Sequence, residues 1–239
     1  MALVRADFPT DDKEKRIRNL KESLVLFERA LEFYDQALDI NEDNLDCQEV
    51  YTSEQILKHR KLRTVGARAP KASDLYGLTL GEQREEWRNK ALLWAMEEVQ
   101  LREELGETKG PGLANAYHTL GYVITEYVDP ENSLAYQGAR DAFEKAARVP
   151  DAAENTKVVI DFCLAWLEYK RDPKNKVAVG KEFDKFLSGL DKLTEANKNS
   201  HSLLCRIEKV ADSLGEEYQL KVAEAFKGVY LPVTSPSSG

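Results

Sequence analysis

The sequence predicts an all-α protein of about nine helices, from three observations. Only 8 prolines and 13 glycines occur in 239 residues, and such sparse punctuation favours long helices over many short strands. Apolar residues recur at intervals of three or four along most of the chain, which is the period of an α-helix. No stretch shows a convincing strand pattern.

The first helix is expected to be long, over about 13–40. Thr10 is a plausible N-cap, and Asp11 and Asp12 follow where the helix dipole favours negative charge. Apolar residues then recur at alternating intervals of three and four, at Ile17, Leu20, Leu24, Phe27, Leu31, Tyr34 and Leu38. Such a stripe packs either against a neighbouring helix of the same chain or in a coiled-coil dimer. The first alternative is favoured, and self-association through 13–40 stays open.

Residues from about 45 to 105 are expected to form a helix, a loop and a further helix. A second helix is expected over about 45–65 and an internal loop over about 66–80, where glycine, proline and serine gather. A third helix over about 82–105 places Trp87 and Trp94 on one side.

The rest of the chain continues as helices. They are expected over about 113–128, 134–148, 155–172, 174–196, 200–214 and 216–230. The segment 155–172 is apolar on nearly all sides, so it should be the most buried helix. Residues 1–230 are therefore expected to form a single domain, and the polar tail 231–239 is expected to be disordered.

Two neighbouring helices carry a recognisable spacing. The residues are Tyr117, Leu120, Gly121 and Ile124, then Ala139, Phe143 and Ala146, then Pro150. This spacing resembles the tetratricopeptide repeat over about 85–150, and residues 28–44 resemble it more weakly. The resemblance implies antiparallel helix pairs stacked in a right-handed array. It also implies that Gly121 lies where two helices cross, which would offset the cost of about 1 kcal/mol for a glycine within a helix.

The chain departs from the repeat pattern in three ways. Tyr117 stands at the tryptophan position, Ile124 stands at the tyrosine position, and the connection between the two helices is about six residues longer than the repeat has. An irregular helical bundle unrelated to the repeat is the alternative fold.

The resemblance also implies a site. Grooves of this family hold peptides or helices and are lined by positions that correspond here to Asn115, His118 and Tyr122. Thr125 continues the same helix face. The function implied is that of a non-catalytic scaffold or adaptor that binds a partner protein or peptide. Family members that clamp chaperone C-termini use lysine and asparagine at such positions, so His118 and Tyr122 argue against a chaperone-tail clamp.

A second candidate site is basic. Residues 58–71 contain six basic side chains and no acidic one, namely Lys58, Arg60, Lys61, Arg63, Arg68 and Lys71. The stretch is either a solvated helix end and loop, or an anchor for an acidic peptide, a phosphate or nucleic acid. Arg60, Lys61 and Arg63 are the binding candidates.

No catalytic or metal-binding pattern is visible in the sequence. The three histidines, His59, His118 and His201, lack a metal-type partner four residues on. We therefore expect no catalytic residue, no metal, no cofactor and no enzyme activity. A helical enzyme or small-ligand binder with a pocket near Trp87, Trp94 and Trp166 is the alternative.

Charge and cysteine content narrow the class of partner and the compartment. The net charge of -8 and the pI near 5.2 make nucleic acid an unlikely partner. A regulator that contacts nucleic acid through residues 58–71 is a further alternative. Three scattered cysteines indicate a reducing compartment, so the cytoplasm is expected and the nucleus is possible. No apolar stretch reaches the roughly 20 residues that a membrane span needs, so no membrane partner is expected.

Overall fold

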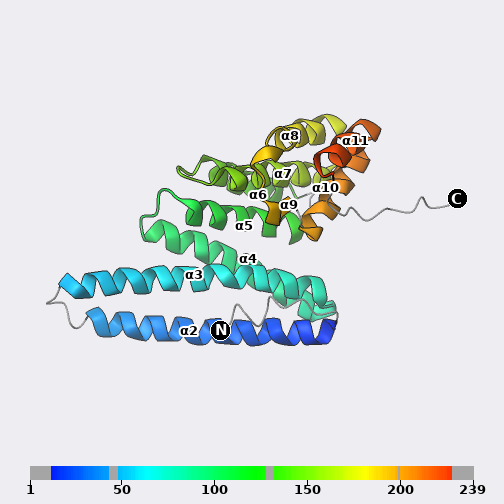
Figure 1. Ribbon diagram of the computed structural model, residues 1–239. Helices are drawn as coiled ribbons and strands as arrows, with labels where there is room; N and C mark the ends of the chain where they lie inside the picture. Colours follow the sequence, from blue (N-terminus) through cyan, green and yellow to red (C-terminus); the bar gives the residue numbers. More distant parts are fainter. Residues whose placement is uncertain (1–11, 43–47, 128–131, 199, 228–239) are drawn as a thin grey trace. The chain divides into compact units, whose positions relative to one another are not determined.

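The computed structural model describes residues 12–42, 48–127, 132–198 and 200–227, and the regular elements in these ranges are all helices (Figure 1). In chain order they are α2 (Lys13–Glu42), α3 (Gln48–Leu78), α4 (Gly81–Glu104), α5 (Pro111–Tyr127), α6 (Ser133–Arg148), α7 (Glu154–Arg171), α8 (Lys176–Ser188), the 3-10 helix η1 (Leu190–Lys192), α9 (Glu195–Lys198), α10 (His201–Leu214) and α11 (Glu216–Ala225). The all-α prediction is confirmed. The predicted disordered tail 231–239 lies outside the described residues, and so does Thr10.

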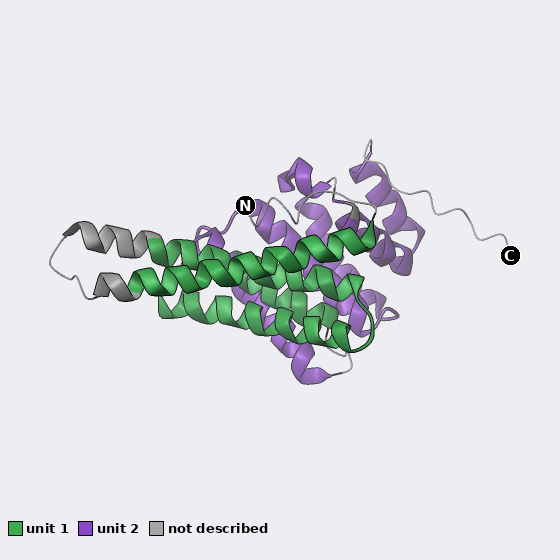
Figure 2. Cartoon of the chain, turned by 90° about the horizontal axis from the view of Figure 1, so that it is seen from below, with its two compact units in different colours: residues 1–108, 115–127 green, residues 109–114, 128–239 purple. Residues whose placement is uncertain are grey.

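The chain divides into two compact units, where the sequence predicted a single domain over 1–230 (Figure 2). Unit 1 comprises residues 1–108 and 115–127, and unit 2 comprises residues 109–114 and 128–239. The first residues of α5 therefore belong to unit 2 and the remainder of α5 to unit 1. Each unit has its own hydrophobic core.

In unit 1, α3 packs against both α2 and α4. Arg16 pairs with Asp74 and Lys61 pairs with Asp35, so α2 and α3 run antiparallel. The core takes its buried side chains from these three helices and from α5: Leu20, Leu24, Phe27, Ala69, Ala72, Leu75, Trp87, Ala91, Trp94, Ala95 and Val123. The apolar stripe of α2 is thus used inside the chain, as the favoured alternative expected. Leu20, Leu24 and Phe27 of the stripe are buried within the chain, and self-association through 13–40 stays a prediction.

The start of α2 differs slightly from the prediction. The carboxylate of Asp12 accepts hydrogen bonds from the backbone N–H groups of Glu14 at 2.9 Å and Lys15 at 3.1 Å. Asp12 therefore caps the helix, a role that the sequence analysis gave to Thr10.

The internal loop predicted over 66–80 is wrong, because α3 continues to Leu78 with Pro70 inside it. Proline within a helix typically costs about 3 kcal/mol. Apolar side chains nevertheless keep helical spacing through this stretch, and Leu62, Val65, Ala69, Ala72 and Leu75 are all buried. Pro70 itself is exposed, so its ring does not disturb the packed face. Burial of that face outweighs the local turn signals.

In unit 2, α7 packs against both α6 and α8, and α10 contacts α7, α8 and α11. The core is rich in aromatic side chains, including Phe162, Trp166, Phe183 and Phe186. All residues from Phe162 to Glu168 of α7 are buried, as its composition predicted. The helix predicted over 174–196 ends at Ser188. There Gly189 lies so close to α7 that a Cβ atom on it would be 2.8 Å from Cγ2 of Val158.

Candidate binding site

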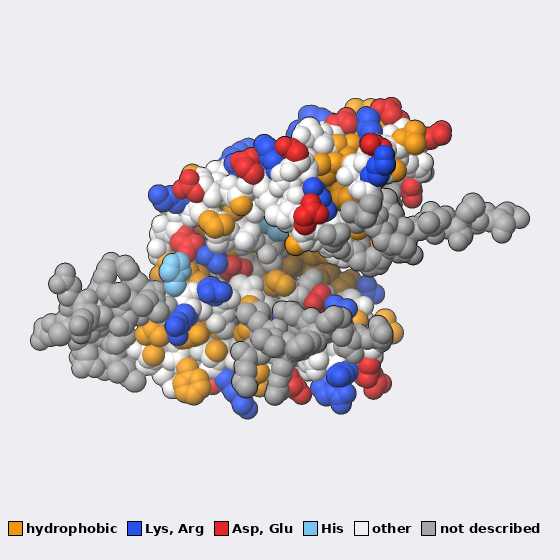
Figure 3. Space-filling view, viewed as in Figure 1, with side chains coloured by type: hydrophobic (Ala, Val, Ile, Leu, Met, Phe, Trp, Pro, Cys, Tyr) orange, Lys and Arg blue, Asp and Glu red, His pale blue; other side chains and the backbone are white. Residues whose placement is uncertain are grey.

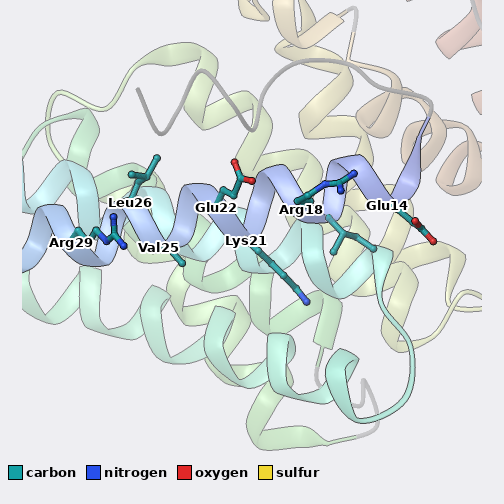
Figure 4. A pocket seen from close by; sticks show the side chains of 8 residues that line it. Glu14, Arg18, Lys21, Glu22, Val25, Leu26 and Arg29 are labelled. Carbon is teal, nitrogen blue, oxygen red and sulfur yellow. The ribbon is translucent and has the colours of Figure 1, made fainter.

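An open cavity of about 590 Å³ follows one face of α2 in unit 1 (Figure 4). Its lining comprises apolar, basic and acidic side chains in alternation: Glu14, Ile17, Arg18, Lys21, Glu22, Val25, Leu26 and Arg29. Figure 4 shows Glu22 and Leu26 on one side of the helix axis and Lys21 and Val25 on the other. Val25 is 46% exposed although it is aliphatic. This face therefore offers apolar surface between charged side chains of both signs.

A second cavity of about 300 Å³ lies between α2 and α4 and shares Lys21 and Val25 with the first. Its other lining residues are Leu24, Glu28, Gln83, Glu86, Trp87, Lys90 and Trp94. Trp87 and Trp94 form its aromatic wall. Because Lys21 and Val25 line both cavities, we call the two together the α2 groove. Figure 3 shows hydrophobic and charged side chains interspersed along the lower edge of the view, where Figure 1 places α2.

Charged side chains hold the aromatic wall of the α2 groove in place. The Lys90 ammonium lies 4.6 Å from the centroid of the Trp87 ring and 2.6 Å from the Glu86 carboxylate. Its hydrogen bond and positive charge lower the pKa of Glu86, so that carboxylate stays ionised at neutral pH. The Arg68 guanidinium lies 5.0 Å from the centroid of the Trp94 ring and pairs with Glu97 at 2.8 Å. Arg68 is buried, and it therefore positions Trp94 from α3.

The four residues that the repeat resemblance placed on one groove face differ in exposure. Asn115 is exposed, His118 and Tyr122 are half-buried, and Thr125 is only 4% exposed. The Thr125 hydroxyl donates a hydrogen bond to the Gly121 carbonyl at 2.8 Å, and Tyr122 packs against the core of unit 1. Thr125 is thus wrongly placed as an outward residue, because its side chain points back onto its own helix. Partner binding by Asn115, His118 and Tyr122 stays a prediction.

The basic stretch is not a single exposed patch. It lies on helix α3, not on a loop, and its cations have different environments. Arg60 and Arg63 are exposed, Lys61 forms an ion pair with Asp35 at 2.5 Å, and Arg68 and Lys71 are buried. Lys61, Arg68 and Lys71 are therefore paired or covered and Lys58 is half-buried, which leaves Arg60 and Arg63 as the exposed candidates. No observation favours the nucleic-acid alternative.

The α2 groove was not predicted from the sequence, because only one apolar stripe of α2 was given a role. Val25, Leu26 and Phe33 are apolar but lie outside that stripe, and Phe33 is 70% exposed. Apolar residues beyond the packing stripe of a long helix were the signal that could have located the site.

Comparisons with protein-family models, with curated proteins and with solved structures found no match for this chain. Within the four described ranges, no three His, Cys, Asp or Glu side chains converge in the way a metal site requires. None of the helices in those ranges combines the length and the apolar character that a membrane crossing requires.

Proposed function

We propose that this chain is a non-catalytic protein-interaction module, and that its α2 groove binds an amphipathic helix or peptide of a partner protein. The observation that carries the proposal is the open apolar surface at Ile17, Val25 and Leu26, bordered by charged side chains. Interfaces commonly combine an apolar centre with a polar rim. An amphipathic partner segment satisfies both parts of this surface.

The dimensions of the groove suit a helical partner. The lining runs from Glu14 to Arg29, which at 1.5 Å per residue is a length of about 22 Å. Arg18, Glu22, Val25 and Arg29 recur at intervals of three or four, so they share one side of α2. A partner helix lying along that side meets charges of alternating sign, and complementary charges on the partner would set its register and direction.

The tetratricopeptide resemblance supports the same function. Several helices that follow one another in the chain pack against one another within each unit, namely α2, α3 and α4 in unit 1 and α6, α7 and α8 in unit 2, as the helix pairs of a repeat array do. We propose that the chain is a divergent member of that structural class, acting as a scaffold or adaptor.

Site-specific photo-crosslinking tests the proposed function. A photoreactive amino acid at Val25 should crosslink a partner that the same amino acid at Leu220, a 65% exposed position of unit 2, does not capture. Charge reversal of Arg18 and Lys21 should reduce the crosslinked product. Identical products from both positions, or a product unaffected by charge reversal, would contradict the proposal.

A small-ligand binder is the second candidate, because Trp87 and Trp94 do line a cavity. Trp166, the third tryptophan of that alternative, lies in the core of unit 2 instead. Under this alternative, an aromatic carboxylate should quench tryptophan fluorescence in the wild type and not in Trp87→Phe/Trp94→Phe. Equal quenching in both proteins rejects it.

A further inference from the structure

The end of the α7–α8 hairpin in unit 2 carries four cations within seven residues, at Lys170, Arg171, Lys174 and Lys176. Arg171, Lys174 and Lys176 are exposed, and Lys170 is half-buried. Among the described residues none of the four forms an ion pair. The carboxylate of Asp172 lies within this run and accepts a hydrogen bond from the Lys174 backbone N–H at 3.0 Å. Asp172 therefore shapes the turn and offsets one of the four positive charges.

Glu168 of α7 and Glu182 of α8 form ion pairs with cations other than these four. Arg140 of α6 donates hydrogen bonds to Glu168 at 2.7 Å and to Glu182 at 3.3 Å. Lys185 also donates to Glu182, at 2.6 Å. Both glutamates are buried, so they face inward and leave the positive charge of the hairpin end available to a partner.

Two fully exposed aliphatic side chains accompany the cations. Val177 at the start of α8 and Leu134 at the start of α6 are each 84% exposed. The Arg171 guanidinium lies 4.1 Å from the centroid of the Tyr136 ring, so the end of α7 and the start of α6 adjoin. Leu134 is two residues from Tyr136 and Val177 directly follows Lys176. We call Leu134, Lys170, Arg171, Lys174, Lys176 and Val177 the hairpin-end surface.

We infer that the hairpin-end surface binds a short acidic segment of a partner protein, one that also carries aliphatic side chains. Four cations within residues 170–176, a run whose one carboxylate is that of Asp172, complement a run of Asp and Glu, and Leu134 and Val177 offer apolar contact. The whole chain has a net charge of -8. A nucleic acid or an anionic bilayer extends beyond the local cations and meets the surrounding negative charge, whereas a short segment does not. This surface is separate from the α2 groove and does not depend on the function proposed for it.

The test measures binding of a fluorescein-labelled synthetic peptide of alternating Glu and Leu to the full chain by fluorescence anisotropy. At low salt the wild type should bind, and Lys174→Glu/Lys176→Glu should weaken binding at least about tenfold. The matched control is Lys109→Glu/Lys209→Glu, which changes net charge equally at two other exposed positions of unit 2. The control should bind the peptide within about twofold of the wild type.

A second variant separates the apolar contribution from the charge contribution. Leu134→Ser/Val177→Ser should weaken peptide binding without changing its salt dependence, because it removes no charge. Thermal melts monitored by circular dichroism should show that all variants fold, since every substituted side chain is exposed. Three results would overturn the inference: no peptide binding to the wild type, equal weakening in both lysine doubles, or binding of phosphatidylserine vesicles or a DNA oligonucleotide through these lysines without binding of the peptide.

Discussion

A single guanidinium connects three helices of unit 2. Besides Glu168 of α7 and Glu182 of α8, Arg140 donates to Glu144 of its own helix at 3.1 Å. The hydroxyl of Tyr136 also donates to Glu168, at 2.5 Å. Two buried carboxylates thus share this cation, and its removal leaves Glu168 without an ion pair, whereas Glu182 retains the one with Lys185.

Arg140→Ala should therefore destabilise the protein by about 3 kcal/mol or more, because the buried Glu168 would lose its ion-pair partner while Glu182 would keep Lys185. Urea unfolding followed by circular dichroism measures the change. Arg148→Ala is the matched control, since Arg148 pairs with Glu144 at 2.9 Å but is 76% exposed. The control should change the free energy of unfolding by less than about 1 kcal/mol, and equal losses in both variants would contradict this account of Arg140.

His118 should make the protein less stable in mild acid. Although part of the His118 residue reaches solvent, the atoms packed around its imidazole desolvate the ring and lower its pKa to about 4 from its usual 6.5. Between these two values the unfolded chain binds more protons than the folded one, so the free energy of unfolding falls as pH drops through this window. In this window the free energy of unfolding can fall by about 1.4 kcal/mol per pH unit. The stability that the neutral imidazole contributes is fully present above pH 6.5 and is lost progressively towards pH 4.

The measurement compares urea unfolding of the wild type and His118→Gln at several pH values between 7 and 4. Burial raises the pKa of Glu98 and Asp161, so these two carboxyl groups make the folded state more stable as pH falls. Because both proteins contain them, the difference in unfolding free energy between the wild type and His118→Gln reports the imidazole. Parallel pH profiles for the two proteins would show that His118 does not titrate in this way.

At the scale of elements, α3 and α4 lie close together beside Gly66. A Cβ atom on Gly66 would lie 2.5 Å from Oε1 of Glu98. Glu98 cannot move aside freely, since it is buried and accepts hydrogen bonds from Arg102 at 2.9 and 3.0 Å. Gly66 is therefore required for helix packing, although its sequence context resembled a loop.

Two glycine-to-alanine changes in the same helix should have opposite effects on thermal stability. Gly66→Ala should destabilise the protein by about 1–3 kcal/mol through overpacking. A Cβ atom on Gly77 meets nothing within 4 Å, so Gly77→Ala should stabilise α3 by about 0.5–1 kcal/mol. If Gly66→Ala proved as harmless as Gly77→Ala, the stretch 66–78 would be a loop after all.

Most of the helices could be predicted from sequence because their apolar period is strong. The prediction failed in α3, where Gly66, Pro70 and Gly77 are turn-forming residues locally while the buried face from Leu62 to Leu75 keeps the helical period. Packing of α3 against α2 and α4 keeps the stretch helical. The turn-forming residues within the stretch do not indicate that these neighbouring helices are present. The same limit applies to the site: cavities between α2 and α4 depend on how helices pack, and the spacing within α2 alone does not reveal them.

At the scale of the whole molecule, the chain crosses between its two units inside one helix. Residues 109–114 belong to unit 2 and residues 115–127 to unit 1. Within unit 2 the Gly110 N–H donates a hydrogen bond to the Pro150 carbonyl at 2.7 Å, and Leu113 is buried. The start of α5 is thus part of the structure that follows it.

Fragments 1–127 and 128–239 should therefore associate when they are co-expressed. The first fragment carries residues 109–114, which unit 2 needs for its own packing. Leu113→Asp in fragment 1–127 should abolish co-purification, because it buries an unpaired charge. Asn115→Asp, at an exposed position of the same helix, should leave it intact. Association that survives Leu113→Asp would contradict the assignment of this segment to unit 2.

The shared helix also constrains how the gene can be rearranged. A recombination event that moves one continuous stretch of coding sequence cannot transfer one unit whole without also moving part of the other, because residues 109–114 of unit 2 precede the last part of unit 1. An exchange at codon 108 removes residues 115–127 from unit 1, and an exchange at codon 127 removes residues 109–114 from unit 2. Separation of the gene into two genes that each encode a complete unit should therefore require a second copy of α5.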